Sequence, residues 1–137
     1  MAFQDIIEFE TGGRGTEDIT ARVNAALEHA GIETGICQLF ILHTSASLLL
    51  TENADPDVRG DIETVLADLA PDGDARFRHR DEGPDDMSAH IRTMLTESSL
   101  VVPVAAGRLK LGTWQGVFLY EHRAAPHRRR IVVTVLG

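Results

Sequence analysis

The chain has 137 residues, of which 25% are charged and 43% hydrophobic, values typical of one soluble globular domain. The 21 acidic and 13 basic residues give a formal net charge of −8, which argues against a main role in nucleic-acid binding, because such proteins present a basic face. No apolar run approaches the roughly 18 residues of a membrane helix, and residues 1–10 lack the pattern of a signal peptide, so we expect no membrane partner.

The first third of the chain predicts a strand, a helix and a second strand. Residues 3–9 alternate loosely and predict a strand, and apolar residues at helical spacing predict an amphipathic helix over about 17–30. Thr16 is the expected N-cap of this helix, and Gly31 is the expected C-cap residue. The nearly continuous apolar run over 34–42 predicts a central strand that is covered on both faces.

The middle of the chain predicts one more strand and two more helices. Residues 43–50 predict a bend and a strand on which the side chains of His43, Ser45 and Ser47 share one face. An Asp-Pro pair at 55–56 predicts the start of a second helix, because Asp is favoured at the N-cap and Pro at the first helical position. The expected buried stripes are Val58, Ile62, Val65, Leu66 and Leu69 in this helix and, after a turn at Pro84, Met87, Ile91, Met94 and Leu95 in a third helix.

The last third of the chain is strand-like. Strands are expected over 99–104, 109–111, 114–122 and 129–136, with the last three as an antiparallel meander. Both faces of the segment 114–122 are largely apolar, so we expect it to be covered on both sides. Because helices precede a run of strands, the expected fold class is α+β.

Three of the six histidines are the leading candidates for chemistry. His43, His90 and His122 each end or border an apolar element, where a neutral imidazole needs a hydrogen-bond partner or a metal ion. Together with nearby carboxylates they would suit a divalent transition metal, whereas each taken singly is also consistent with an ordinary structural histidine. His79 lies in a polar linker, so we interpret it as a linker residue.

Two polar loops are the other candidate binding segments. The loop 51–56 precedes a helix and offers amides for an anion, although Asp55 is also explained as an N-cap. In the segment 107–116, glycines flank Trp114, which suits a close backbone approach to a ligand. Trp114 would either stack on a flat heterocycle or fill the core. The basic run 128–130 suits either phosphate binding or a solvated strand end.

The chain contains four polar motifs, His43–Ser47, Glu52–Val58, Glu82–Ile91 and Gly107–Gly116, followed by Glu121-His122-Arg123. In order and spacing these motifs resemble those of the YjbQ-like family. The resemblance covers essentially the full chain and implies an α+β fold of antiparallel, sandwich-like sheets with about three helices in one domain, residues 1–137. It also implies a homotrimer, a polar pocket near subunit boundaries and a divalent metal, zinc or magnesium. The chain has Asp86 where the family often has Asn.

The family label implies a secondary thiamine-phosphate synthase, which joins a pyrimidine pyrophosphate to a thiazole phosphate and releases pyrophosphate. Such a site must neutralise the leaving pyrophosphate and hold two flat rings together. The motif positions give the candidate site: catalytic His43, Ser45, Asn53, Asp55 and Glu121; substrate-binding Arg108, Gly112, Thr113, Trp114, Gln115 and Arg123; and metal-binding His43, His90 and His122.

Two rival functions keep the same site. One is a metal-assisted hydrolase of a small phosphorylated substrate, and the other is a metal- or small-ligand-binding trimer without turnover. Residues 1–74 carry a charge balance of −12 and residues 75–137 one of +4, so we expect a site that draws on both halves to bind an anionic ligand with a divalent ion. The single cysteine, Cys37, indicates a reducing, cytoplasmic compartment.

Overall fold

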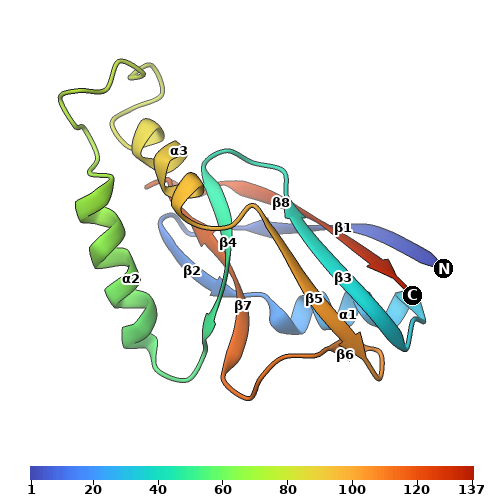
Figure 1. Cartoon of the computed structure of the whole chain (residues 1–137). Helices are drawn as coiled ribbons and strands as arrows, with labels where there is room; N and C mark the ends of the chain where they lie inside the picture. Colours follow the sequence, from blue (N-terminus) through green and yellow to red (C-terminus); the bar gives the residue numbers. More distant parts are fainter.

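The computed structural model describes all 137 residues and contains two antiparallel sheets and three helices (Figure 1). One sheet has the strand order β1-β8-β3-β5-β6, and the other has the order β2-β7-β4. The expected α+β class is confirmed. No helix has the length and apolar character needed to cross a membrane. The elements are β1 (Ala2–Glu10), β2 (Gly15–Asp18), α1 (Thr20–Ala30), β3 (Thr34–Ile41), β4 (Ala46–Glu52), α2 (Pro56–Leu69), α3 (Asp86–Leu95), β5 (Ser99–Ala105), β6 (Arg108–Leu109), β7 (Gln115–Glu121) and β8 (Arg128–Leu136).

The hydrophobic core lies between the two sheets and α1. Its 20 residues come from both sheets, from α1, from the N-cap residue Ile19 and from the turn that follows α1, and none comes from the segment 56–95. Six of the seven residues of β7 are buried, which confirms the expected cover on both sides of that strand. By contrast, β3 alternates: Cys37, Leu39 and Ile41 are buried, whereas Ile36 and Phe40 are exposed. The expectation that this strand is covered on both faces is therefore wrong for the single subunit.

Two local predictions near the N-terminus fail because a short strand was missed. Residues Gly15–Asp18 form β2, which pairs with β7, so α1 begins only at Thr20 and Thr16 does not cap it. Gly31 does end the helix, with a left-handed φ of 65° that suits glycine.

The expected C-terminal meander is also wrong. β7 pairs with β2 and β4, and β8 pairs with β1 and β3, because the loop between β7 and β8 carries the chain from one sheet to the other.

The start of α2 is as predicted, but its buried face is not. Asp55 is the N-cap, and its Oδ1 accepts a hydrogen bond from the amide of Asp57 at 2.9 Å. Of the five expected stripe residues only Leu66 is fully buried, while Val65 and Leu69 are 56% and 61% exposed. In Figure 1, α2 stands to one side of the sheets instead of packing across them.

Helix α3 buries a face that is mostly polar. Its buried residues are Asp86, Ser88, Ala89 and Arg92, whereas the apolar Met94 and Leu95, which were expected to be buried, are exposed. Polar contacts therefore attach the helical segment 56–95 to the β-structure.

Glu63 is central to this attachment. Its carboxylate accepts hydrogen bonds from Arg92 Nη1 at 2.7 Å and Nη2 at 3.1 Å, and from the Tyr120 hydroxyl at 2.9 Å. Because the Arg92 side chain is buried, loss of Glu63 would leave an uncompensated charge inside the protein.

We therefore expect Glu63→Ala to lower the free energy of unfolding by about 3 kcal/mol, measured by urea denaturation. The matched control is Asp68→Ala, which removes an exposed carboxylate from the same helix and should change stability by less than about 0.5 kcal/mol. Equal effects of the two substitutions would contradict the proposed role of Glu63.

Candidate metal centre

Three side chains that could ligate a metal ion converge at the N-terminal part of α3. The ligand atoms of His79, Asp86 and His90 all lie within 4.8 Å of one another. Oδ2 of Asp86 lies 2.6 Å from Nε2 of His79 and 3.0 Å from Nε2 of His90. The cluster is the only group of three or more such residues in the chain that could hold a metal ion.

Local sequence explains how these residues meet. Asp86 and His90 are four residues apart on α3, so their side chains share one face of the helix. His79 comes from the loop between α2 and α3, and this loop folds back because the amide of Gly73 donates to the carbonyl of Pro84 at 2.9 Å. All three candidate ligands therefore belong to the segment 79–90.

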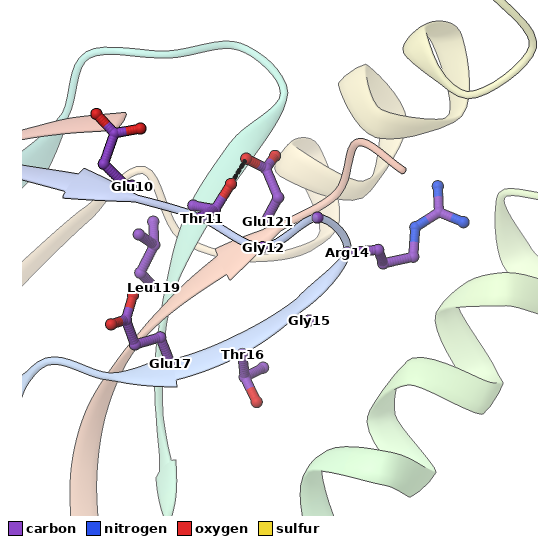
Figure 2. Close-up of a pocket in the computed structure, with 10 residues that line it drawn as sticks. Glu10, Thr11, Gly12, Arg14, Gly15, Thr16, Glu17, Leu119 and Glu121 are labelled. Carbon is purple, nitrogen blue, oxygen red and sulfur yellow. Dashed lines mark hydrogen bonds between the residues drawn. The ribbon is translucent and has the colours of Figure 1, made fainter. Parts of the chain in front are cut away.

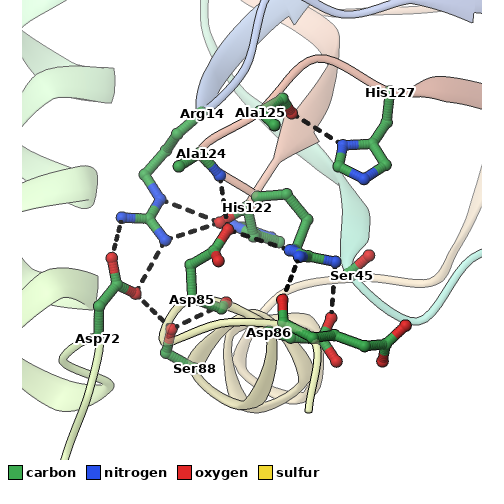
Figure 3. A network of polar contacts seen from close by, with 12 residues as sticks. Arg14, Ser45, Asp72, Asp85, Asp86, Ser88, His122, Ala124, Ala125 and His127 are labelled. Atoms are coloured by element: carbon green, nitrogen blue, oxygen red, sulfur yellow. Dashed lines mark hydrogen bonds and ion pairs between the residues drawn. The ribbon is translucent and has the colours of Figure 1, made fainter. Parts of the chain in front are cut away.

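Neighbouring groups orient both the carboxylate and one imidazole. Nδ1 of His90 donates to the carbonyl of Thr44 at 2.8 Å, which directs Nε2 toward Asp86. Arg123 donates to Oδ1 of Asp86 at 3.0 Å and to Oδ2 of Asp85 at 3.0 Å, and Figure 3 shows both carboxylates in this network. Such outer contacts are the usual support for metal-binding histidine and carboxylate side chains.

The charges at the cluster favour an ionised carboxylate. Burial by itself would raise the pKa of Asp86, but the hydrogen bond with His79 and the nearby positive charges outweigh it and lower the pKa. The same hydrogen bond raises the pKa of His79. The side chain of Asp86 is only 3% exposed, so this negative charge depends on its neighbours for stabilisation.

The donor set fits a transition metal. Two imidazole nitrogens and one carboxylate oxygen are typical zinc ligands, and three protein ligands leave a coordination position open for a small molecule. Magnesium prefers oxygen ligands, so the pair of histidines favours zinc or a related ion.

The predicted histidine set is only partly reproduced. His90 belongs to the cluster, but His43 lies on the β3–β4 loop, where its Nε2 accepts a hydrogen bond from the amide of Arg130 at 2.8 Å. His122 is fully buried, and its Nε2 lies 2.7 Å from the hydroxyl of Ser47. Within the subunit, His43, His90 and His122 therefore form no common ligand set.

Sequence reasoning missed His79 and the role of Asp86. His79 lies in a linker without periodicity, and Asp86 had an adequate explanation as an acidic residue near a helix N-terminus. The spacing of Asp86 and His90, four residues apart on an expected helix, was the available signal.

Ser45 and Glu121 belong to a second, buried polar cluster. Glu121 accepts hydrogen bonds from the Thr11 hydroxyl at 2.7 Å and from Nε of Arg129 at 2.8 Å, and Arg129 also donates to the Ser45 hydroxyl at 3.0 Å. Burial would raise the pKa of Glu121, but Arg129 and Thr11 lower it. Thr11 and Glu121 also line a hollow of about 300 Å³, and Figure 2 shows the contact between them.

Most of the predicted substrate-binding residues lie far from the metal-ligand cluster of His79, Asp86 and His90. In the β4–β7 pairing, Ala46 is opposite Glu121 and Glu52 is opposite Gln115, so the two ends of this seven-residue ladder are about 20 Å apart. Trp114 is 62% exposed at the far end, and its carbonyl accepts from the amide of Asn53 at 2.9 Å. The residues of that end are Asn53, Asp55, Gly112, Thr113, Trp114 and Gln115, whereas Arg108 lies on β6.

Arg123 is at the metal-ligand cluster, but its guanidinium is already engaged. Besides the two carboxylates, its Nη2 donates to the carbonyl of Glu82 at 2.8 Å. These contacts make Arg123 a residue that positions Asp86, and its predicted role as a phosphate ligand stays a prediction.

Comparison with known proteins agrees with the fold. The profile of a family described as "UPF0047 protein YjbQ-like" matches residues 5–137. The chain is 48% identical to "UPF0047 protein sll1880" of Synechocystis over 98% of this chain and 91% of that protein, and 44% identical to "UPF0047 protein YjbQ" of Salmonella typhimurium over 100% and 99%. It is similar to the crystal structure of the conserved hypothetical protein TT1486 from Thermus thermophilus, with a TM-score of 0.87, 39% identity, and coverage of 96% of this chain and 99% of that one. The chain therefore belongs to the YjbQ-like, UPF0047 family.

Zinc titration by calorimetry tests the metal-ligand cluster. We expect the wild-type protein to bind one Zn²⁺ per chain and His79→Ala or His90→Ala to weaken binding at least about tenfold. The control is His43→Ala, which should bind zinc like the wild type. Loss of binding in His43→Ala together with full binding in His79→Ala would overturn the assignment.

His122 predicts a distinct pH dependence of stability. Burial, followed by the charge of Arg92, lowers the pKa of His122 from 6.5 to about 3. Below pH 6.5 the unfolded chain takes up a proton that the folded chain excludes, so the stability contribution present at neutral pH is lost as pH falls from about 6.5 toward 3. The slope approaches about 1.4 kcal/mol per pH unit.

We expect urea denaturation between pH 7 and pH 4.5 to show a shallower loss of stability in His122→Gln than in the wild type. His29→Gln, which changes an exposed histidine on α1, should keep the wild-type slope. An unchanged slope in His122→Gln would show that this imidazole does not resist protonation.

Proposed function

We propose that this chain is a divalent-metal-dependent hydrolase of a small phosphorylated substrate, with His79, Asp86 and His90 as the metal ligands. The convergence of two Nε2 atoms on a single buried carboxylate oxygen carries the proposal. When bound there, a divalent ion would supply Lewis-acid stabilisation of the negative charge that develops during hydrolysis.

The surrounding residues support such a site in two ways. Arg123 and the carbonyl of Thr44 hold Asp86 and His90 in place, so little reorganisation is needed when a ligand binds. The side chains of His79 and His90 are 40% and 31% exposed, which leaves the cluster open to a small molecule from solvent.

A transferase of the thiamine-phosphate synthase type is the second candidate function. Its support is the exposed indole of Trp114 on a loop that hydrogen bonds hold in place, because the amide of Gly112 donates to Oε1 of Gln115 at 2.8 Å. A fixed aromatic surface suits the stacking of a heterocycle. Within one subunit this loop is at the opposite end of the β4–β7 ladder from the metal-ligand cluster, so the transfer would need the loop of another copy.

Assembly as a homotrimer in the cytoplasm is part of the same proposal. The outer face of the five-stranded sheet exposes apolar residues that neighbour one another in the sheet, such as Ile36 beside Leu136, and no helix covers them. Exposed apolar surfaces of this kind favour association with another chain. The single thiol, Cys37, is buried and suits a reducing compartment.

A screen of phosphate esters, with zinc-loaded and metal-free protein, tests the proposed function. We expect hydrolysis only with metal, a loss of at least about a hundredfold in His90→Ala, and full activity in His29→Ala. Formation of thiamine phosphate from the two ring substrates would favour the transferase. Tight zinc binding without any turnover would contradict both enzymes and support the non-catalytic, metal-binding alternative.

A further inference from the structure

The loop between α2 and α3 encloses a hollow beside the metal-ligand cluster. The hollow has a volume of about 250 Å³, and its lining includes Phe77, His79, Arg80 and Pro84. Because His79 belongs both to this lining and to the metal-ligand cluster, a molecule in the hollow would be next to a bound metal ion.

Two backbone hydrogen bonds stabilise the fold of this loop. The Gly73 amide donates to the Pro84 carbonyl at 2.9 Å, and the Gly83 amide donates to the Arg80 carbonyl at 3.1 Å. Gly73 and Gly83 have φ values of 69° and 99°, a region that favours glycine. A hollow formed in advance lowers the entropic cost of binding a ligand.

Arg80 supplies a fixed positive charge to the hollow. Nε of Arg80 donates to the Phe77 carbonyl at 2.7 Å and Nη2 donates to the Ala75 carbonyl at 3.1 Å, so backbone groups fix the guanidinium and no carboxylate neutralises it. The one acidic residue of the lining, Asp74, is paired with Arg76 at 2.6 Å. A fixed, unneutralised guanidinium suits an anion such as a phosphate group.

The rest of the lining is suited to an apolar ring. Phe77 is half-buried, so its ring is partly available, and Pro84 adds a second apolar surface. Aromatic side chains bind flat apolar groups through offset or edge contacts.

We infer that this hollow binds the organic part and the anionic group of the substrate, which is an aromatic or similarly flat phosphate ester. The inference rests on the proposed function, because it assigns the substrate class of the same metal site. Arg80 contacts the phosphate group, and Phe77 contacts the ring.

The test is the binding of phenyl phosphate, measured by calorimetry on zinc-loaded protein, with inorganic phosphate as the second probe. We expect Arg80→Gln to weaken phenyl phosphate binding at least about tenfold. Phe77→Ala should weaken phenyl phosphate but leave inorganic phosphate unchanged. The matched control is Arg78→Gln, which removes the same charge from the same loop outside the hollow and should bind like the wild type.

Zinc affinity, measured separately on each variant, distinguishes this inference from the proposed function. If zinc binds but phenyl phosphate does not, or if Arg78→Gln and Arg80→Gln weaken it equally, the inference is overturned and the metal centre stands. If phenyl phosphate binding depends on Arg80 in a protein that binds no zinc, the hollow is supported and the proposed function fails. Circular dichroism of the variants, which change exposed or half-exposed loop residues, confirms that they are folded.

Discussion

The buried carboxylate of Asp86 is the constraint on which the surrounding structure depends. An ionised carboxylate removed from water is strongly destabilising unless opposite charges and hydrogen bonds compensate it. Here Arg123 donates to one oxygen, while His79 and His90 face the other. The same contacts fix the loop after β7, the loop after α2 and the first turns of α3 against one another. The atoms that stabilise the carboxylate are therefore also the atoms that would shape a metal site.

Apolar packing and buried polar contacts hold different parts of the molecule together. The sheets and α1 hold the apolar core, and the helical segment 56–95 contributes nothing to it. That segment is attached through buried polar groups such as Arg92 with Glu63. Removal of one partner from a buried polar contact is strongly destabilising, because the other group is left unpaired. Such contacts nevertheless place ionised groups at defined positions. The candidate metal centre and the hollow beside it both lie in this polar part of the molecule.

The sequence predicts the elements that have strong local signals. Asp55 followed by Pro56 is sufficient to begin α2, and the two apolar faces around Phe118 are sufficient to identify a buried strand. Strand pairing is not local, so the meander expected for the last strands fails when the chain crosses between sheets. The candidate metal centre likewise is predicted only where a local sequence signal exists. His90 can be predicted because it borders an apolar helix face. His79 reaches the site through the closure of a loop, which no periodic sequence pattern predicts.

The proposed metal centre of His79, Asp86 and His90 is best tested by anomalous diffraction at the zinc edge, using crystals of the zinc-loaded wild-type protein. We expect one strong peak per chain between Nε2 of His79, Nε2 of His90 and Oδ2 of Asp86. A peak on His43 or His122, or none near Asp86, would contradict it.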